Sequence, residues 1–467
     1  PRLRRHRLLR NTSLGRLVVI LVALIALPAV GLESPTEDLG THAPITIIIT
    51  SGRMERSLES QTGAVSALEL SEEDRQGPAA GLGDLLDPVP GVFAASRFNG
   101  AQDLRLSVRG FGARGNFGIR GIRILLDGFP LTLPDGQSAL DDLDPALIAR
   151  AEVRRGPAGS LYGSSAGGVI SLESPDLFVS TGLFAGASTG SYGTYEGRLG
   201  YGSVYGDQAL GAQASVRHSD GYRDHSKQEH RLVTLKYQGD SRNGDSLSAF
   251  LTAVDSPYAL DPGGLTKEEY SRDRRAASPI KRAYDAGEEV RQLRTGIALT
   301  RPAGSGEIRL RGQAIGRDFE NKLPFSATEL DRAVGTFSLE LEQQYEPVNT
   351  LWRWVAGVDL ALQRDRRKRF LNDLGNEGAT TADQRETVMT ACGFLSVIVV
   401  HYGNLNLQAG LRADWLEFVL YDKFMDVGDV SGQMTFAELS PGGGASFRIR
   451  ECLDLFGLVS TAFEPPT

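Results

Sequence analysis

Residues 405–415 read LNLQAGLRADW, and the side chains of this stretch alternate between apolar and polar. The apolar positions are Leu405, Leu407, Ala409, Leu411, Ala413 and Trp415, and the polar ones include Asn406, Gln408, Arg412 and Asp414. A period of two is typical of a β-strand with one apolar and one polar face. The same split recurs in EIRLRGQA (307–314), TFSLELE (336–342) and LWRWVAGVDL (351–360). Strands of about ten residues with this pattern indicate a transmembrane β-barrel of the outer-membrane type.

The links between the expected strands support this interpretation, because they alternate between short and long, except that the first two strands are joined at TGSYGTY (189–195) by a short link where a long loop is expected. Short turns fall at 205–207, 240–244, 302–306, 346–349, 403–404 and 450–454, and long loops at 219–229, 255–290, 318–331, 364–384 and 421–434. Membrane barrels follow this rule, whereas a soluble sandwich or propeller has no reason to do so. We count 13 strands. Bacterial barrels close with even numbers, so we expect this sequence to be a truncated part of a longer chain.

Composition excludes several other classes of protein. The 55 glycines among 467 residues suit many tight turns. The net charge of −8 argues against a nucleic-acid partner, because phosphate binding needs a basic face. Cys392 and Cys452 form neither a disulfide framework nor a metal-binding spacing, so we expect no metal and no cofactor.

The N-terminal half divides into three segments before the strands begin. Residues 1–31 combine an arginine-rich start, an apolar run of 11 residues (LVVILVALIAL) and small residues after it, which predicts a secretory signal peptide. Residues 32–52 form an acidic linker that ends in a β-branched run. Residues 53–176 predict a compact α+β domain with helices at LGDLLDPV (82–89) and ALDDLDPALIARAEV (139–153), and the barrel strands occupy 177–467.

Two short motifs in the α+β domain suggest chemistry but lack the structural context that it requires. Gly110, Gly112 and Gly115 fit the dinucleotide pattern G-x-G-x-x-G, yet NFGIRGIRILLDG follows them instead of a helix. Ser165 fits the hydrolase pattern G-x-S-x-G, yet the strand-like GVISLES follows it. We therefore expect neither nucleotide binding nor a catalytic residue, and the protein is predicted not to be an enzyme.

Two longer stretches carry a resemblance to a known family. SVRGFGARGNFGIRGIRILLDGFPLTLPDGQ (107–137) and IARAEVRRGPAGSLYGSSAGGVISLES (148–174) resemble the plug domain of TonB-dependent outer-membrane receptors. Within the family, the sequence looks similar to siderophore receptors and to the receptor for pyrroloquinoline quinone. The resemblance implies a 22-stranded barrel with the plug inside it. It also implies a location in the outer membrane of a Gram-negative bacterium, in contact with its lipid.

The resemblance also assigns the energy input. ITIIITSGR (45–53) is similar to the TonB box, with Ile45, Thr46, Ile47, Ile48, Ile49 and Thr50 as its residues. TonB, with its inner-membrane complex, would pair with this strand in the periplasm by edge-to-edge hydrogen bonds. The alternative is an ordinary first strand of the plug, which has the same sequence signal.

The resemblance further names plug residues that contact the barrel and the ligand. Arg109 and Arg155 would pair with barrel glutamates as a latch, and the alternation places Glu340 and Glu342 on the inner face, although the partners could lie outside this sequence. The residues expected to bind an extracellular ligand are Arg97, Phe98, Arg114, Asn116, Phe117, Phe129, Asp135 and Gln137. Arginine suits carboxylate or catecholate oxygens, and aromatic rings provide stacking area.

The sequence thus predicts active uptake of a scarce solute, with a ferric siderophore or other iron chelate first. A non-iron cofactor such as pyrroloquinoline quinone is the alternative ligand. A passive porin or adhesion barrel is the alternative class, which the plug and the TonB-box-like segment disfavour.

Overall fold

The structure is a computed structural model, and it describes residues 48–49, 53–54, 56–57, 61–71, 81–95, 99–115, 118–401, 404–424, 426, 428–450 and 453–465. All of these belong to one compact unit, Ile47–Thr467. The predicted signal peptide and most of the predicted linker lie outside the described residues. Within them, no helix is both long enough and apolar enough to cross a lipid bilayer.

A small α+β domain comes first, and we call it the plug. Its elements are β1 (Ile48–Ile49), β2 (Arg56–Ser57), β3 (Val65–Glu69), α3 (Leu82–Leu86), β4 (Val92–Ala95), β5 (Arg105–Val108), β6 (Ile122–Leu126), β7 (Phe129–Pro130), η3 (Pro145–Leu147), β8 (Arg150–Arg155), α4 (Gly159–Tyr162) and β9 (Gly168–Glu173). The main sheet has the order β3-β8-β9-β6-β7, in which β6 and β9 are parallel. Its core includes Ile122, Ile124, Val153 and Ile170, all fully buried.

Local sequence explains the sharp corners of the plug. The β6–β7 hairpin turns at Asp127 and Gly128, which both have positive φ (52° and 77°), as the Asp-Gly hairpin turn requires. Gly168 begins β9 with φ 136°, and a Cβ there would lie 2.1 Å from the carbonyl oxygen of Arg154. Only glycine fits this close approach of two strands.

The second of the two predicted plug helices is absent. Residues 82–86 form α3 as predicted, but the stretch 139–153 gives only the short η3 followed by β8. Pro145 follows Asp144, whose carboxylate caps the backbone N–H of Ala146 at 3.0 Å, and the chain then becomes extended. Ala151 and Val153, two residues apart, both point into the core, and this spacing is that of a strand.

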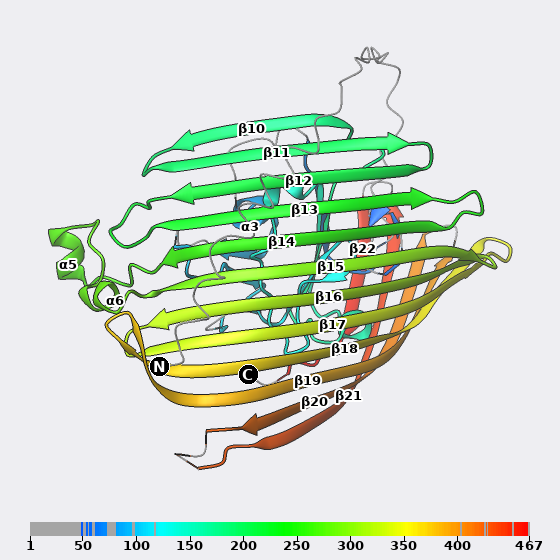
Figure 1. The fold of residues 1–467 in the computed structure, drawn as a ribbon. Helices are drawn as coiled ribbons and strands as arrows, with labels where there is room; N and C mark the ends of the chain where they lie inside the picture. The colour runs from blue at the N-terminus through cyan, green and yellow to red at the C-terminus, as the bar shows by residue number, and fades with distance from the viewer. Residues whose placement is uncertain are drawn as a thin grey trace. The chain divides into compact units, whose positions relative to one another are not determined.

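The remainder of the described chain forms one antiparallel sheet of 13 strands in sequential order, as predicted (Figure 1). The strands are β10 (Gly182–Gly190), β11 (Thr194–Tyr205), β12 (Gln208–Ser219), β13 (Gln228–Asp240), β14 (Ser246–Leu260), β15 (Gly287–Ala303), β16 (Gly306–Leu323), β17 (Ser326–Tyr345), β18 (Thr350–Asp373), β19 (Asn376–His401), β20 (Leu405–Asp422), β21 (Gly432–Arg450) and β22 (Leu453–Ser460). The helices α5 (Lys267–Arg272) and α6 (Pro279–Ala283) lie in the loop between β14 and β15.

Two of the predicted long loops are wrong. Residues 318–331 and 364–384 belong to strands, because β16 and β17 meet in a tight turn at Pro324 and Phe325, and β18 and β19 meet at Leu374 and Gly375. The strands here reach 26 residues, against the expected ten. Charged residues occupy both faces of these outer strand ends, so the period-two pattern is absent there and a loop was predicted.

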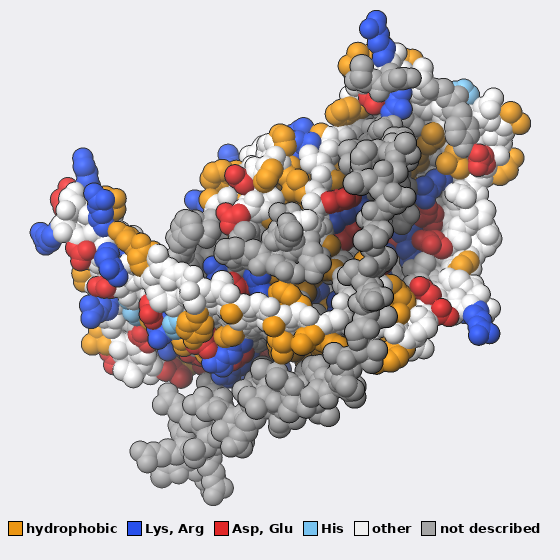
Figure 2. Space-filling model, turned by 90° about the horizontal axis from the view of Figure 1, so that it is seen from above, with side chains coloured by type: hydrophobic (Ala, Val, Ile, Leu, Met, Phe, Trp, Pro, Cys, Tyr) orange, Lys and Arg blue, Asp and Glu red, His pale blue; other side chains and the backbone are white. Residues whose placement is uncertain are grey.

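Alternation along the sheet separates a plug-facing side from an opposite side. Lys236, Arg317, Arg332 and Gln363 make side-chain hydrogen bonds to the plug, which identifies the plug-facing positions. The intervening positions are largely apolar and exposed, among them Leu293, Ile297, Phe337, Leu360 and Leu395. From above, red and blue side chains lie next to each other in the hollow of the molecule (Figure 2). The polar face of the sheet therefore meets the plug, and its apolar face points away.

Candidate functional site

A cavity of about 540 Å³ lies between the plug and the plug-facing side of the sheet. The β6–β7 region lines it from the plug, with Arg123 and Phe129, and strands β16 to β20 line it from the sheet, with Glu340, Asp359 and Arg412. Its lining is rich in both arginines and carboxylates. The interface between plug and sheet can bury both arginines and carboxylates, because each charged side chain has an oppositely charged partner nearby.

Arg53 is the centre of this boundary. Its guanidinium binds Glu340 Oε1 at 2.6 Å and Asp359 Oδ2 at 2.7 Å, one carboxylate from β17 and one from β18. The same guanidinium lies over the rings of Tyr162, on α4 of the plug, and of Phe394, on β19, at 4.6 and 4.1 Å from the ring centroids. Arg53 therefore connects the start of the plug to three adjacent strands of the 13-stranded sheet, which we call the wall.

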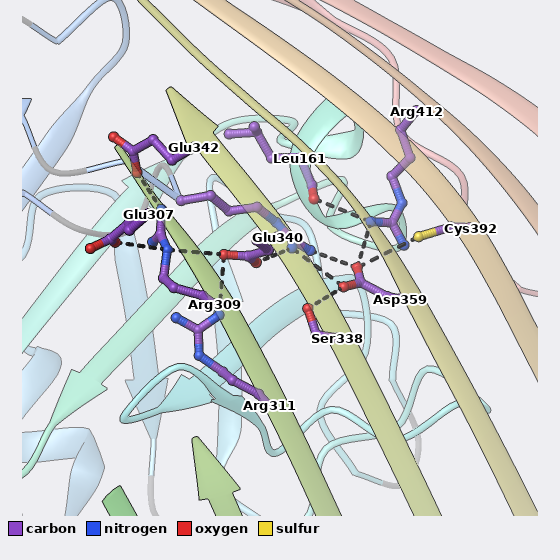
Figure 3. A network of polar contacts seen from close by, with 11 residues as sticks. Leu161, Glu307, Arg309, Arg311, Ser338, Glu340, Glu342, Asp359, Cys392 and Arg412 are labelled. Carbon is purple, nitrogen blue, oxygen red and sulfur yellow. Dashed lines mark hydrogen bonds and ion pairs between the residues drawn. The ribbon is translucent and has the colours of Figure 1, made fainter. Parts of the chain in front are cut away.

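Further arginines hold the two carboxylates in place (Figure 3). Arg311 and Arg309, on β16, reach Glu340 Oε2 at 3.2 and 3.7 Å. Asp359 accepts hydrogen bonds from Arg412 at 2.9 Å and from the Ser338 hydroxyl at 2.8 Å. Arg412 also donates to the carbonyl oxygen of Leu161, which joins β20 to α4. The network is thus continuous from β16 to β20 and contacts the plug twice.

Burial and neighbouring carboxylates shift the pKa values of two plug arginines at this boundary, Arg53 and Arg123. Burial opposes the charge of Arg53, but the Asp359 and Glu340 carboxylates outweigh it and raise the pKa of Arg53. Burial lowers the pKa of Arg123 to about 10, and attraction from Asp359 offsets only part of this effect. In the described part of the chain, the buried Nε of Arg123 has no hydrogen-bond partner. Arg123 is therefore the least compensated cation of the cavity.

A second contact with the wall comes from the plug segment 135–144, which we call the docking segment. Asp135 accepts from Arg332 of β17 at 3.1 Å, and Asp141 accepts from Arg317 of β16 at 2.6 Å. Asp142 pairs with Arg294 of β15, and both side chains are almost completely buried. Asp144 lies 4.0 Å from Arg198 of β11. Successive aspartates thus meet arginines of different strands.

The predicted ligand residues fall into two groups. Arg97, Phe98, Asn116 and Phe117 lie outside the described residues. Of the others, Phe129 is buried and packs edge-on against Phe250 of β14, with ring centroids 5.0 Å apart. Asp135 binds the wall through Arg332 and Gln363, and Gln137 packs against Gly118. Arg114 is exposed.

Arg114 lines a second cavity, of about 580 Å³, together with Arg109 and Arg120. Backbone geometry places these arginines around the glycine-rich turn. Gly112 has φ 87°, and a Cβ there would lie 2.7 Å from the carbonyl oxygen of Leu106. Three arginines and one carboxylate, Glu464, line this cavity, and the guanidinium groups can bind the oxygens of an anionic solute. The glycine motif thus forms the wall of a cavity with no helix after it.

The structure shows no barrel glutamate bound to either predicted latch arginine, Arg109 or Arg155, among the described residues. Arg155 donates to the carbonyl oxygen of Pro90 at 2.8 Å and to the Ser66 hydroxyl at 3.1 Å. Arg109 is exposed and has φ 50°. Glu340, one of the two glutamates expected to face inward, does pair with a plug arginine, but that arginine is Arg53.

Sequence reasoning missed Arg53 because its partners are 287 and 306 positions away. The only available signals were its place directly after the β-branched run and the inward position of Glu340. In that run, Ile48 and Ile49 form β1, which pairs with β2, and Ile49 is fully buried. The other TonB-box residues, 45–47 and 50, lie outside the described residues.

Other expected absences concern sites for metals and nucleophiles. Ser165 is fully buried, donates to the carbonyl oxygen of Gly163 at 3.3 Å and precedes a strand. Within the described ranges, no cluster of three or more His, Cys, Asp or Glu side chains is arranged to hold a metal ion.

Known proteins with similar sequences are receptors. Residues 57–170 match the model of the TonB-dependent Receptor Plug Domain. The hemin receptor of Yersinia pestis is 26% identical over 447 residues, which are 91% of this chain and 61% of that protein. The hemin receptor of Yersinia enterocolitica is 31% identical over 233 residues, 46% of this chain and 32% of that protein. The chain thus spans less than two thirds of the length of these relatives.

Solved structures show the same fold at low sequence identity. The ferric citrate transporter FecA superposes with a TM-score of 0.69 at 16% identity, covering 84% of this chain and 62% of that one. The alcaligin receptor FauA from Bordetella pertussis gives 0.66 at 14% identity, covering 86% and 63%. Residues 57–170 are thus a plug domain of the TonB-dependent receptor type, and this domain is docked on the inner face of a sequentially ordered antiparallel sheet, as in the fold of these transporters.

Proposed function

We propose that the protein is an outer-membrane receptor that takes up an iron chelate, with hemin or a ferric siderophore as the substrate class. The observation that carries the proposal is the plug itself, bound through buried ion pairs to the polar face of a sheet whose other face is apolar. A lumen filled in this way does not conduct solutes passively. Uptake then needs both a ligand site and an energy input that moves the plug.

The ligand site proposed here is the cavity lined by Arg109, Arg114 and Arg120. Hemin carboxylates and siderophore carboxylates or catecholates present oxygens in pairs, which guanidinium groups bind in a bidentate manner. The outer loop that holds α5 and α6 adds exposed Lys and Arg side chains, which project at the left of Figure 2. Asp261 of this loop accepts from Asn99 of the plug at 2.9 Å, so loop and plug are joined.

The energy input proposed is the segment 45–50, acting as a TonB box after export directed by residues 1–31. Because β1 pairs with β2 and Ile49 is buried, TonB would have to gain an exposed strand edge or displace this pairing. An Ile47→Pro variant removes a backbone donor and should abolish uptake while leaving ligand binding intact. Wild-type uptake by this variant would contradict the assignment.

Growth of a deletion strain, complemented by the full receptor gene, tests the substrate class. Hemin, a ferric catecholate and ferric citrate are each supplied as the only iron source, and pyrroloquinoline quinone is supplied in a separate assay of a quinoprotein dehydrogenase. We expect growth on at least one iron chelate, and we expect short-term uptake of that chelate in labelled form to be lost on collapse of the proton gradient. Uptake that persists without the gradient would favour a passive porin. If the receptor supports only the quinoprotein assay and growth on no iron chelate, the ligand is pyrroloquinoline quinone and not an iron chelate.

Binding by the proposed ligand site is tested with purified receptor and the chelate that supports growth. Arg114→Gln should weaken binding about tenfold or more, since a charge-assisted hydrogen bond contributes about 1.5–3 kcal/mol. Arg242→Gln, in an exposed turn at the other end of the strands, is the matched control and should bind as the wild type does. Equal affinity of both variants would exclude Arg114 from the site.

A further inference from the structure

A row of charged residues crosses the sheet on the side that faces away from the plug. The strand register places them directly opposite one another from β13 to β19: Arg231, Asp255, Arg291, Asp318, Asp331, Arg366 and Arg385. Asp318, Asp331, Arg366 and Arg385 are exposed. Because side chains alternate along each strand, all seven belong to the same face as the exposed apolar residues.

The charged row lies at one edge of the apolar band. On β15 the outward positions between Arg301 and Arg291 are Leu299, Ile297, Thr295 and Leu293. Ten residues of strand rise roughly 33 Å. At a tilt of about 45° this corresponds to about 23 Å, close to the roughly 25 Å apolar band of membrane barrels. The row therefore marks the level at which the hydrocarbon of the outer leaflet ends.

At one place in this row the charges are all positive. Arg364 and Arg366 are two residues apart on β18 and point the same way, about 7 Å apart. Arg385 of β19 lies directly opposite Arg366. Like charges opposite one another in a sheet are destabilising unless an anion offsets them. In the described part of the chain, these three arginines form no ion pair with a carboxylate.

The neighbours of the three arginines leave room for an anion. Across the strands, Arg364 faces Ala333 and Thr387, and Arg385 faces Tyr421, which is 55% exposed. Two carboxylates adjoin the three arginines on this face: Asp331 of β17 lies opposite Arg366, and Asp383 lies two positions from Arg385 on β19. Lys368, the next outward residue of β18, lies opposite Asp383 of β19 on one side and Glu329 of β17 on the other.

We propose that Arg364, Arg366 and Arg385 form a binding site for the phosphate group of a lipid head group in the outer leaflet. Their height matches the head-group level, their charge matches phosphate, and guanidinium groups bind phosphate oxygens in pairs. The exposed ring of Tyr421 fits the same level, where aromatic side chains concentrate in membrane barrels. The proposal rests on the outer-membrane location proposed above and adds a lipid contact specific to β18 and β19.

Lipid selectivity of the full receptor tests the proposal. The receptor is reconstituted into phosphatidylcholine vesicles, and electron spin resonance compares spin-labelled phosphatidic acid with spin-labelled phosphatidylcholine at the protein surface. We expect a preference for phosphatidic acid of about fivefold or more, the factor that one basic residue near an anionic surface supplies. The triple variant Arg364→Gln, Arg366→Gln, Arg385→Gln should lose most of it, and the triple Arg→Lys variant should keep most of it.

A matched control carries the same loss of charge elsewhere on exposed positions: Arg242→Gln, Arg272→Gln and Arg274→Gln. This control should retain the preference. A wild type without preference, or a triple Gln variant that keeps it, would overturn the lipid site. A receptor that fails to insert into vesicles, and so shows no motionally restricted lipid of either kind, would instead overturn the membrane location on which the site rests.

Discussion

Removing the Arg53 guanidinium should loosen the start of the plug more than any other single plug substitution in the described part of the chain. An Arg53→Met variant keeps much of the volume and deletes the charge. Breaking a buried ion pair by removing one partner costs about 3–5 kcal/mol. Asp359 keeps Arg412 and Ser338, and Glu340 keeps Arg311, so the residual carboxylates are partly compensated. We therefore expect a value near the lower end, about 3 kcal/mol.

Hydrogen exchange of plug amides measures this directly in the full receptor, because local opening sets the exchange rate. A loss of about 3 kcal/mol corresponds to exchange about 150-fold faster for amides around residues 48–57 and 159–162. Arg155→Met is the matched control. It removes hydrogen bonds that stay within the plug, at a partly exposed site, so it should change exchange by less than about fivefold.

A double-mutant cycle separates the ion pair from general disruption. Arg53→Met and Glu340→Gln should couple by about 2 kcal/mol, within the range for contacting charged residues. Additive effects would show that the two side chains stabilise the plug independently. An Arg53→Met variant whose exchange stays within about threefold of the wild type would refute the reasoning.

Three further predictions concern other residues of the plug. Arg123→Met removes a poorly compensated cation, so it should stabilise the plug by about 1 kcal/mol in the same exchange experiment; a destabilised variant would show that Arg123 has an effective partner. Burial opposes ionisation of Asp127 and Asp141, but Lys236 and Arg317 outweigh it and lower both pKa values below 3.8. Their contribution is therefore complete above pH 3.8 and lost as the pH falls through the folded-state values, which heat-unfolding midpoints between pH 6 and pH 2 would show. Gly168→Ala should cost about 2 kcal/mol or more, because its Cβ meets a backbone carbonyl at positive φ; an unchanged unfolding midpoint would contradict this.

The sequence predicted the features that repeat locally. The alternation of Ile308 and Leu310 with Arg309 and Arg311 identified both the strand and its faces, because each strand repeats its burial every second residue. It failed above the apolar band, where Arg364 faces outward and Asp365 faces inward, so that both faces carry charged side chains. Within the apolar band, the apolar outward face contrasts with the polar plug-facing side and produces the period of two. Beyond the band both faces of the sheet are polar, so this contrast is lost.

The site was less predictable than the fold because it depends on long-range pairing. The plug motif predicted a ligand site at the glycine turn around Arg114, and this turn lines a cavity. No local pattern relates Arg53 to Asp359, since the register of 13 strands decides which carboxylate reaches the plug. The same holds for Asp135, which was predicted to bind a ligand and which accepts a hydrogen bond from Arg332 of the wall in this structure.

The tight turns at residues 324–325 and 374–375 have a consequence for recognition. Each closes a long pair of hydrogen-bonded strands, so this sector of the outer rim is already ordered before any ligand arrives. Ordering a flexible side chain on binding costs about 0.5–1.5 kcal/mol, and a preformed rim avoids much of that cost. In the receptor proposed above, a solute that meets this sector would be selected by shape and by fixed charge, and adaptation to different solutes would fall to the loop at 261–286.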